Sequence, residues 1–150
     1  MSIAVGDKIP TFSLESQQGE FTTVSATDGQ KKVIYFYPKN ETKVCTAQAC
    51  SFRDWQEEFV KRKYIVFGIS SDTVSSHRDF HSRHKLNFTL LSDEKGKVRK
   101  QFGATTFLGL IPSRKTFLVN KEGIVTFIYE GLFEAEKHVK EVLKALETKA

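Results

Sequence analysis

Two cysteines that lie close together are the residues of this chain best suited to redox chemistry. Cys45 and Cys50 are the only cysteines in the 150-residue sequence. Two are too few for a disulfide scaffold, and too few for a zinc site built mainly of thiolates. In a cytosolic protein, a close pair is more often catalytic than structural. The pair therefore predicts thiol chemistry within residues 45–50.

The segment before Cys45 favours a reactive form of its thiol. The thiolate, not the thiol, is the nucleophile. An apolar strand followed by a helical pattern places Cys45 at or near a helix N-terminus, where unpaired backbone N–H groups and the helix dipole favour negative charge. Lys43 is the local cation that would add to this effect.

Thr42 and Pro38 are suited to handle a peroxide beside that thiolate. Attack on a peroxide needs donors that hold its two oxygens in line and stabilise charge on the leaving oxygen. The Thr42 hydroxyl, three residues before Cys45, can serve both the thiolate and the peroxide; a simple helix N-cap is the alternative role. Pro38 has a rigid ring and no N–H, so it can exclude water without competing for hydrogen bonds.

The two cysteines fall on different faces of the expected helix. Cys45 lies on an apolar stripe that should face a sheet, with Trp55 at the edge of this stripe and expected to pack in the core. Cys50 lies on the opposite, polar side. Their α-carbons would be roughly 8–9 Å apart in an intact helix, whereas a disulfide needs about 4.4–6.8 Å. A Cys45–Cys50 bond therefore requires the first turns to unwind.

A strand–helix–strand unit is predicted to position these residues. Residues 33–37 and 64–70 are apolar, β-prone runs suited to strands buried on both faces, and helical spacing extends from Cys45 to about Lys61. Such a unit forms a right-handed crossover on a parallel sheet.

The later part of the chain predicts further helices and strands. Asp72 is expected to cap the next helix, and Asn120–Gly123 is typical of a hairpin turn. In chain order, the expected elements are a helix, a strand, a helix, two hairpin strands and a last helix, at residues 72–84, 88–91, 93–102, 115–119, 124–129 and 134–147. This order predicts a thioredoxin-like α/β fold, with a central mixed sheet, helices on both faces and an insertion between residues 72 and 102. The length predicts one domain over residues 1–150.

The motif Pro38-x-x-x-Thr42-x-x-Cys45 resembles the signature of the peroxiredoxins. With Cys50 and the following Phe52-Arg53-Asp54, it is similar to the peroxiredoxin Q or bacterioferritin comigratory protein subgroup. The resemblance covers most of the chain, including Val5-Gly6-Asp7-x-x-Pro10 near the start and residues 113–120 near the end.

This resemblance implies a role for each site residue. Cys45 would be the peroxidatic cysteine and Cys50 the resolving one, while Arg114 would stabilise the thiolate and orient the peroxide. The implied reaction reduces hydrogen peroxide or an organic hydroperoxide, through a sulfenic acid on Cys45 and an intramolecular Cys45–Cys50 disulfide. Thioredoxin or a similar dithiol would reduce that disulfide. The chain departs from the family pattern at Lys43-Val44, where many members have Pro-Gly, and at Gln48, where glutamate is usual.

Charge, histidines and hydropathy add expectations about partners. The net charge is +5, but the basic residues are scattered, which favours a solvated surface over a nucleic-acid site and leaves an acidic reductase as an alternative partner. His77, His81 and His84 share one helical face, which we interpret as solvated rather than as a metal site, and no metal or cofactor is expected. No apolar run reaches the ~20 residues of a membrane span.

These features lead to expectations about location and assembly, and they leave two alternative functions open. We expect a cytoplasmic protein, or an organellar one if a transit peptide has been removed, that is a monomer or weak homodimer. A thiol–disulfide oxidoreductase is one alternative, although such enzymes use Cys-x-x-Cys. A non-catalytic holdase or redox-sensing module on the same fold is the other.

Overall fold

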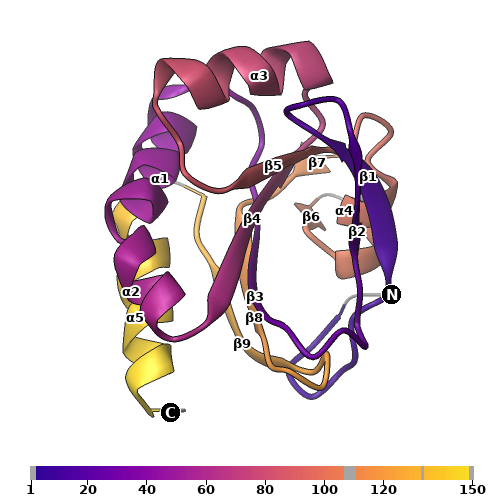
Figure 1. Ribbon diagram of the computed structural model, residues 1–150, viewed down its shortest axis with the longest axis vertical. Coiled ribbons are helices and arrows are strands. Elements are labelled where there is room, and N and C mark those ends of the chain that lie inside the picture. Colours follow the sequence, from indigo (N-terminus) through magenta and orange to yellow (C-terminus); the bar gives the residue numbers. More distant parts are fainter. Residues whose placement is uncertain (1–2, 107–110, 133, 149–150) are drawn as a thin grey trace.

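The protein is built around a mixed β-sheet, seen in a computed structural model that describes residues 3–106, 111–132 and 134–148 (Figure 1). The seven-stranded sheet has the strand order β2-β1-β5-β4-β3-β8-β9, and β6 and β7 form a separate pair. The strands are β1 (Phe12–Ser16), β2 (Phe21–Val24), β3 (Lys31–Phe36), β4 (Tyr64–Ser70), β5 (Thr89–Ser92), β6 (Thr105–Thr106), β7 (Ile111–Pro112), β8 (Lys115–Val119) and β9 (Val125–Glu130). The helices are α1 (Lys43–Asp54), α2 (Gln56–Lys61), α3 (Val74–Arg83), α4 (Lys97–Phe102) and α5 (Ala135–Thr148).

The central strand β3 connects the parallel and antiparallel parts of the sheet. It pairs in parallel with β4, where Val33 lies opposite Val66, and antiparallel with β8, where Val33 lies opposite Leu118. The run from Val33 to Phe36 is fully buried, as expected for a strand covered on both faces. The predicted strand–helix–strand crossover is therefore confirmed, and its helical part carries both cysteines.

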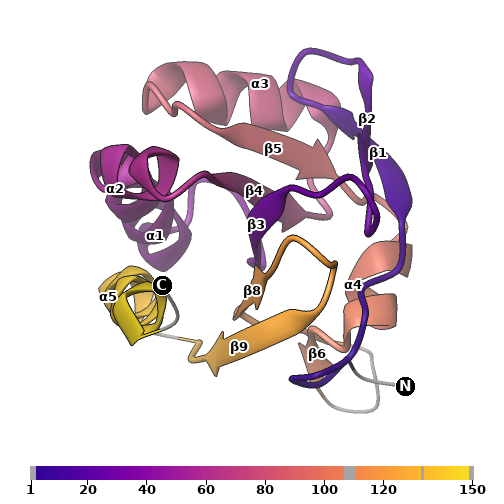
Figure 2. The ribbon, with the colours of Figure 1, turned by 60° about the horizontal axis from the view of Figure 1, so that its bottom comes forward.

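Alternate residues of β3 supply two separate cores. Val33 and Tyr35 point into the core under α1, α3 and α5, whereas Ile34 and Phe36 point into the core that contains Phe102 of α4. This alternation follows from the two-residue period of a strand. Figures 1 and 2 show α1, α2, α3 and α5 on one side of the sheet and α4 on the other. The predicted α/β fold, a mixed sheet with helices on both faces, is confirmed.

The helix predicted from Cys45 to Lys61 is interrupted at Trp55. This residue ends α1 and begins α2, with φ −100° and ψ 9°, and its N–H donates to the Ser51 carbonyl. The break turns the indole outward, and Trp55 is 46% exposed. The expectation that Trp55 packs in the core was wrong, because it assumed that one straight helix continued through this residue.

Two expectations about α3 were also wrong. Thr73, not Asp72, is the N-cap, and its hydroxyl accepts a hydrogen bond from the Ser76 N–H. His77 is 0% exposed, so the three histidines do not form a solvated face. Its ring nitrogens lie near Tyr37 and Asn40 of the segment after β3 and near Ser70 of β4, which the helical spacing of α3 does not reveal.

The helices and the metal-binding side chains of the described residues bear on membranes and metals. None of the helices in the described part of the chain has the length and apolar character needed to span a membrane. Within the same residues, no group of three or more histidine, cysteine or acidic side chains is placed to hold a metal ion.

Candidate active site

Cys45 lies in the first turn of α1, two residues after the helix begins at Lys43. Its side chain is 1% exposed and its thiol is free; Cys50, further along the same helix, is also free and half-buried. The helix is continuous through both residues. The structure therefore represents a reduced state in which the two sulfurs are held on one intact helix.

Arg114 reaches Cys45 from the segment just before β8. Its side chain is 3% exposed, and Nη2 donates to the Cys45 Sγ over 3.2 Å. Nη1 donates to the Gln48 Oε1 over 2.5 Å, and Nε donates to the Leu132 carbonyl over 2.7 Å. These partners hold the guanidinium plane in one orientation. The same guanidinium therefore connects the Cys45 sulfur to Gln48 and to the Leu132 carbonyl.

The other partners of the Arg114 guanidinium are uncharged groups. Gln48 is fully buried and contributes a neutral amide, whose Nε2 has no hydrogen-bond partner among the described residues. The other partner is a backbone carbonyl. No carboxylate in the described part of the chain forms an ion pair with Arg114. The Cys45 sulfur is thus the remaining side-chain partner of this buried guanidinium.

A cavity of about 380 Å³ opens onto the Cys45 sulfur. Four residues singled out from the sequence, Pro38, Thr42, Cys45 and Arg114, line it together. Its other lining residues are Lys43, Val44, Pro112 and Leu132. The cavity therefore combines a largely apolar wall with one thiol, one guanidinium, one hydroxyl and the side chain of Lys43. Cys50 is not among the lining residues.

Thr42 lies at the N-cap position of α1 but does not cap the helix with its side chain. Its hydroxyl donates instead to the Lys39 carbonyl over 2.9 Å. The hydroxyl proton is therefore used in a bond within the loop, and the oxygen keeps the capacity to accept a hydrogen bond. The cation expected at Lys43 is supplied by Arg114, since Lys43 is exposed and Arg114 is the residue bonded to the sulfur.

Several residues around the site were not singled out from the sequence. The Leu132 carbonyl and the amide of Asn40 are two of them, and no local pattern marks either. His138, which the sequence left without a role, is buried and lies between the Thr116 hydroxyl and the Gly131 carbonyl, each 2.8 Å from one of its ring nitrogens. Burial lowers the pKa of His138 to about 4. It is therefore neutral at pH 7 and adds no second positive charge beside Arg114.

Comparisons with known proteins agree on one family. The AhpC/TSA family model matches residues 5–128. Peroxiredoxin Q, chloroplastic, from Oryza sativa subsp. japonica is 45% identical over 147 residues, which cover 97% of this chain and 68% of the rice protein. Among solved structures, peroxidoxin BcpB from Mycobacterium tuberculosis is 32% identical with a TM-score of 0.89, covering 97% of both chains. A Xanthomonas campestris bacterioferritin comigratory protein, studied for alkyl peroxide reduction, is 29% identical with a TM-score of 0.85, covering 95% of this chain and 99% of that one.

Proposed function

Because the chain belongs to the AhpC/TSA family, as a thiol peroxidase of the peroxiredoxin Q subgroup, we propose that Cys45 attacks the hydroperoxide and Cys50 resolves the product. The observation that carries this assignment is the 3.2 Å hydrogen bond from Arg114 to the Cys45 sulfur at the cavity. Among the described residues, no guanidinium donates to the Cys50 sulfur, and Cys50 does not line the cavity. This difference in surroundings supports Cys45 as the residue that attacks the peroxide and Cys50 as the residue that resolves the product.

The first step is a two-electron oxidation of Cys45. Its thiolate attacks the terminal oxygen of the hydroperoxide, so that an S–O bond forms while the O–O bond breaks. Cys45 becomes a sulfenic acid, and the leaving oxygen takes up a proton to give water or an alcohol. Arg114, fixed by Gln48 and Leu132, stabilises the charge that develops on the oxygens. Thr42 and Pro38 border the same space and would orient the peroxide and exclude water.

The second step joins the two cysteines. The Cys50 thiolate attacks the Cys45 sulfenic sulfur, an S–S bond forms, and the oxygen leaves as water. Both residues lie in α1, where the α-carbons of an intact helix are roughly 8–9 Å apart at this spacing. A disulfide needs about 4.4–6.8 Å. The helix must therefore unwind between them before the bond closes.

The cavity supports organic hydroperoxides as substrates beside hydrogen peroxide. Pro38, Val44, Pro112 and Leu132 offer apolar contacts that an alkyl group can fill, and hydrogen peroxide needs only the polar groups near the sulfur. We further propose that thioredoxin or a similar dithiol returns the disulfide to two thiols, in a reducing compartment such as the cytoplasm. Strands from both ends of the chain share one sheet, which supports a single domain over residues 1–150. An intramolecular disulfide needs no second subunit, so the reaction is compatible with a monomer or a weak homodimer.

Mapping the sulfur products tests this assignment. The reduced protein is treated with one equivalent of hydrogen peroxide and then digested for mass spectrometry. We expect a Cys45–Cys50 disulfide in the wild type, and a sulfenic acid trapped by dimedone at Cys45 in Cys50→Ser. Cys45→Ser should consume no peroxide. Equal reactivity of both thiols, or a covalent dimer as the sole wild-type product, would contradict the assignment.

A thiol–disulfide oxidoreductase is separated from the peroxidase by a second assay. With the same dithiol donor, we expect rapid peroxide consumption and negligible reduction of insulin disulfides. The opposite preference would favour the oxidoreductase.

A further inference from the structure

The loop between β3 and α1 carries a buried amide side chain, that of Asn40. Its neighbours Lys39 and Glu41 are exposed, but Asn40 is 4% exposed. A buried amide is costly unless its donors and acceptor are all bonded. The partners of Asn40 therefore indicate what this loop is built to hold.

Asn40 uses every hydrogen-bonding group of its side chain. Its Oδ1 accepts from the Tyr37 hydroxyl over 2.6 Å. Its Nδ2 donates to the Ser76 hydroxyl over 3.1 Å and lies 3.0 Å from the His77 Nδ1. The Asn40 backbone N–H donates to the Asp72 carboxylate over 2.8 Å. Three of these four bonds cross to α3 or to the segment that leads into it, so the loop is attached to that helix.

His77 can accept the bond from Asn40 only while it is neutral. Burial lowers the pKa of His77 to about 4, so the ring is neutral at pH 7. With Nδ1 as the acceptor, the ring proton is assigned to Nε2, which lies 3.4 Å from the Ser70 hydroxyl. The network around Asn40 is therefore complete under ordinary conditions.

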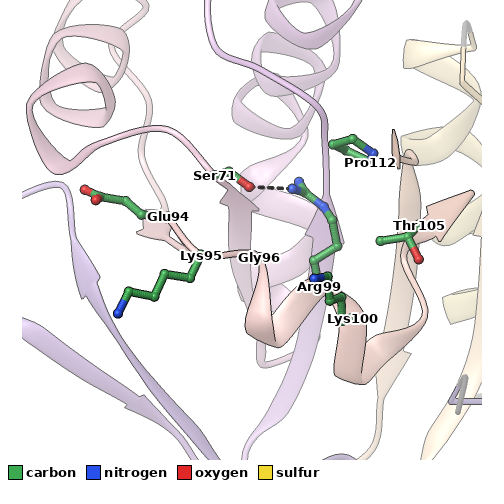
Figure 3. Close-up of a pocket in the computed structure, with 8 residues that line it drawn as sticks. All are labelled: Ser71, Glu94, Lys95, Gly96, Arg99, Lys100, Thr105 and Pro112. Carbon is green, nitrogen blue, oxygen red and sulfur yellow. Dashed lines mark hydrogen bonds between the residues drawn. The ribbon is translucent and has the colours of Figure 1, made fainter. Parts of the chain in front are cut away.

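The start of the loop is held from the opposite face of the sheet as well. The Tyr37 carbonyl accepts a hydrogen bond from the Arg99 Nη2 over 2.6 Å, and the Tyr37 N–H donates to the Ile69 carbonyl over 3.1 Å. Arg99 comes from α4, and its Nη1 donates to the Ser71 hydroxyl over 2.7 Å (Figure 3). Figure 3 shows the guanidinium reaching across toward Ser71, with Pro112 nearby. Pro112 also lines the cavity at Cys45.

The end of the loop is attached to α3 by Glu41. This residue has a positive φ of 62°, a conformation that costs a side chain other than glycine roughly 1–2 kcal/mol. Its carboxylate lies 2.8 Å from the Arg83 guanidinium and 3.1 Å from the His84 Nε2. The loop is thus fixed along its length to elements other than α1.

We propose that Asn40 is a positioning residue of the peroxidase, which holds Pro38 and Thr42 in place through α3 while the first turns of α1 unwind and re-form. This proposal rests on the proposed roles of Cys45 and Cys50. Asn40 touches no reacting atom, so its effect is geometric. Before the reaction, it holds Pro38 and Thr42 in the positions in which they line the peroxide cavity. After the reaction, it keeps the residues before α1 in place, so that the helix can re-form from them.

The test compares two reactions of Cys45 in Asn40→Ala. One is oxidation by hydrogen peroxide, measured by stopped flow, and the other is alkylation by iodoacetamide, measured at Cys45 by peptide mass spectrometry. A displaced loop removes the groups that orient the peroxide, so we expect the peroxide rate constant to fall by about tenfold or more. Alkylation uses the same cavity but needs no alignment of two peroxide oxygens, and Arg114 keeps its hydrogen bond to the Cys45 sulfur, so the alkylation rate should change less than twofold. Asn87→Ala, which removes an exposed amide that donates to the Arg53 carbonyl, is the matched control and should leave both rates unchanged.

Ser76→Ala provides a milder variant that keeps a helical residue in α3. It removes one of the two acceptors of Asn40 Nδ2, and we expect a smaller loss, about threefold, again confined to the peroxide reaction. An unchanged peroxide rate in the folded variants, or a parallel fall of both rates, would overturn the positioning role. Cys45→Ser separates this outcome from a failure of the proposed function. If that variant is inactive and Asn40→Ala behaves as wild type, only the role of Asn40 fails.

Discussion

Replacing Ala47 by glycine should accelerate the closure of the Cys45–Cys50 disulfide about four- to fivefold. Ala47 lies in α1 between the two cysteines and is exposed, so the substitution removes a methyl group without opening the core. Glycine is less favourable than alanine in a helix interior by roughly 0.8–1.0 kcal/mol. At 25 °C, where RT is about 0.59 kcal/mol, this raises the ratio of unwound to helical α1 roughly four- to fivefold. Because the disulfide closes only from the unwound form, its rate rises by the same factor.

The assay follows the disulfide directly. Reduced protein is mixed with one equivalent of hydrogen peroxide and quenched at intervals with acid and an alkylating agent, and the 45–50 disulfide is quantified by mass spectrometry. At high peroxide, the fraction of Cys45 converted to sulfinic acid should fall by a similar factor, since faster closure removes the sulfenic acid sooner. Ser75→Gly, at an exposed position of α3, is the control and should leave closure unchanged. A wild-type closure rate in Ala47→Gly would refute the requirement for unwinding.

Two further predictions concern Arg114 and the buried histidines. Arg114→Gln should slow the reaction of Cys45 with peroxide about tenfold to a hundredfold in stopped-flow measurements, because a hydrogen bond to a charged group contributes about 1.5–3 kcal/mol. The control is Arg78→Gln, at an exposed position, which should have no effect. A wild-type rate in Arg114→Gln would remove Arg114 from the mechanism. The free energy of unfolding by urea should fall as the pH drops from about 6.5 to about 4. Burial lowers the pKa of His77 and His138 from 6.5 to about 4, so in this window the unfolded chain binds protons that the folded chain does not. A free energy that stays constant there, or falls equally in a His77→Asn, His138→Asn double variant, would contradict this reasoning.

The sequence was most informative where one local pattern decides the structure. The apolar runs at β3 and β4 are long enough to be buried on both faces, and the structure has them as adjacent parallel strands. Pro38, Thr42 and Cys45 all lie in the connection from β3 into α1. They therefore meet at one cavity because this short segment reverses the direction of the chain. Arg114 lies far away in sequence, and only the resemblance to a family pointed to it.

The sequence was least informative about buried polar residues. Asn40 and His77 are 37 positions apart. Each is surrounded in sequence by polar residues of the kind found in an exposed loop or on an exposed helix face. Their burial depends on side chains that meet only after the sheet and α3 have packed together. The break at Trp55 was missed for a related reason, since helical spacing continues across it and only the backbone geometry interrupts the helix.

The N-terminal hairpin of β1 and β2 was not predicted either. Its strands are rich in serine and threonine, and Phe21 is 74% exposed, so they lack a continuous buried face. The hairpin joins the main sheet through a short contact, in which Glu15 and Ser16 pair with Ser92 and Leu91. Strands at the edge of a sheet carry a weaker hydrophobic pattern than central ones, which explains why this pair escaped detection.

Phe52 packs α1 firmly against the central strand just beyond the segment that the proposed disulfide requires to unwind. Its ring is 0% exposed and stacks on Tyr35 of β3, with ring centroids 4.4 Å apart and planes at 18°. On the proposed mechanism, unwinding confined to residues 45–50 would leave this contact in place. The aromatic core would then stay buried in the oxidised protein, which would expose no additional apolar surface on which copies could aggregate.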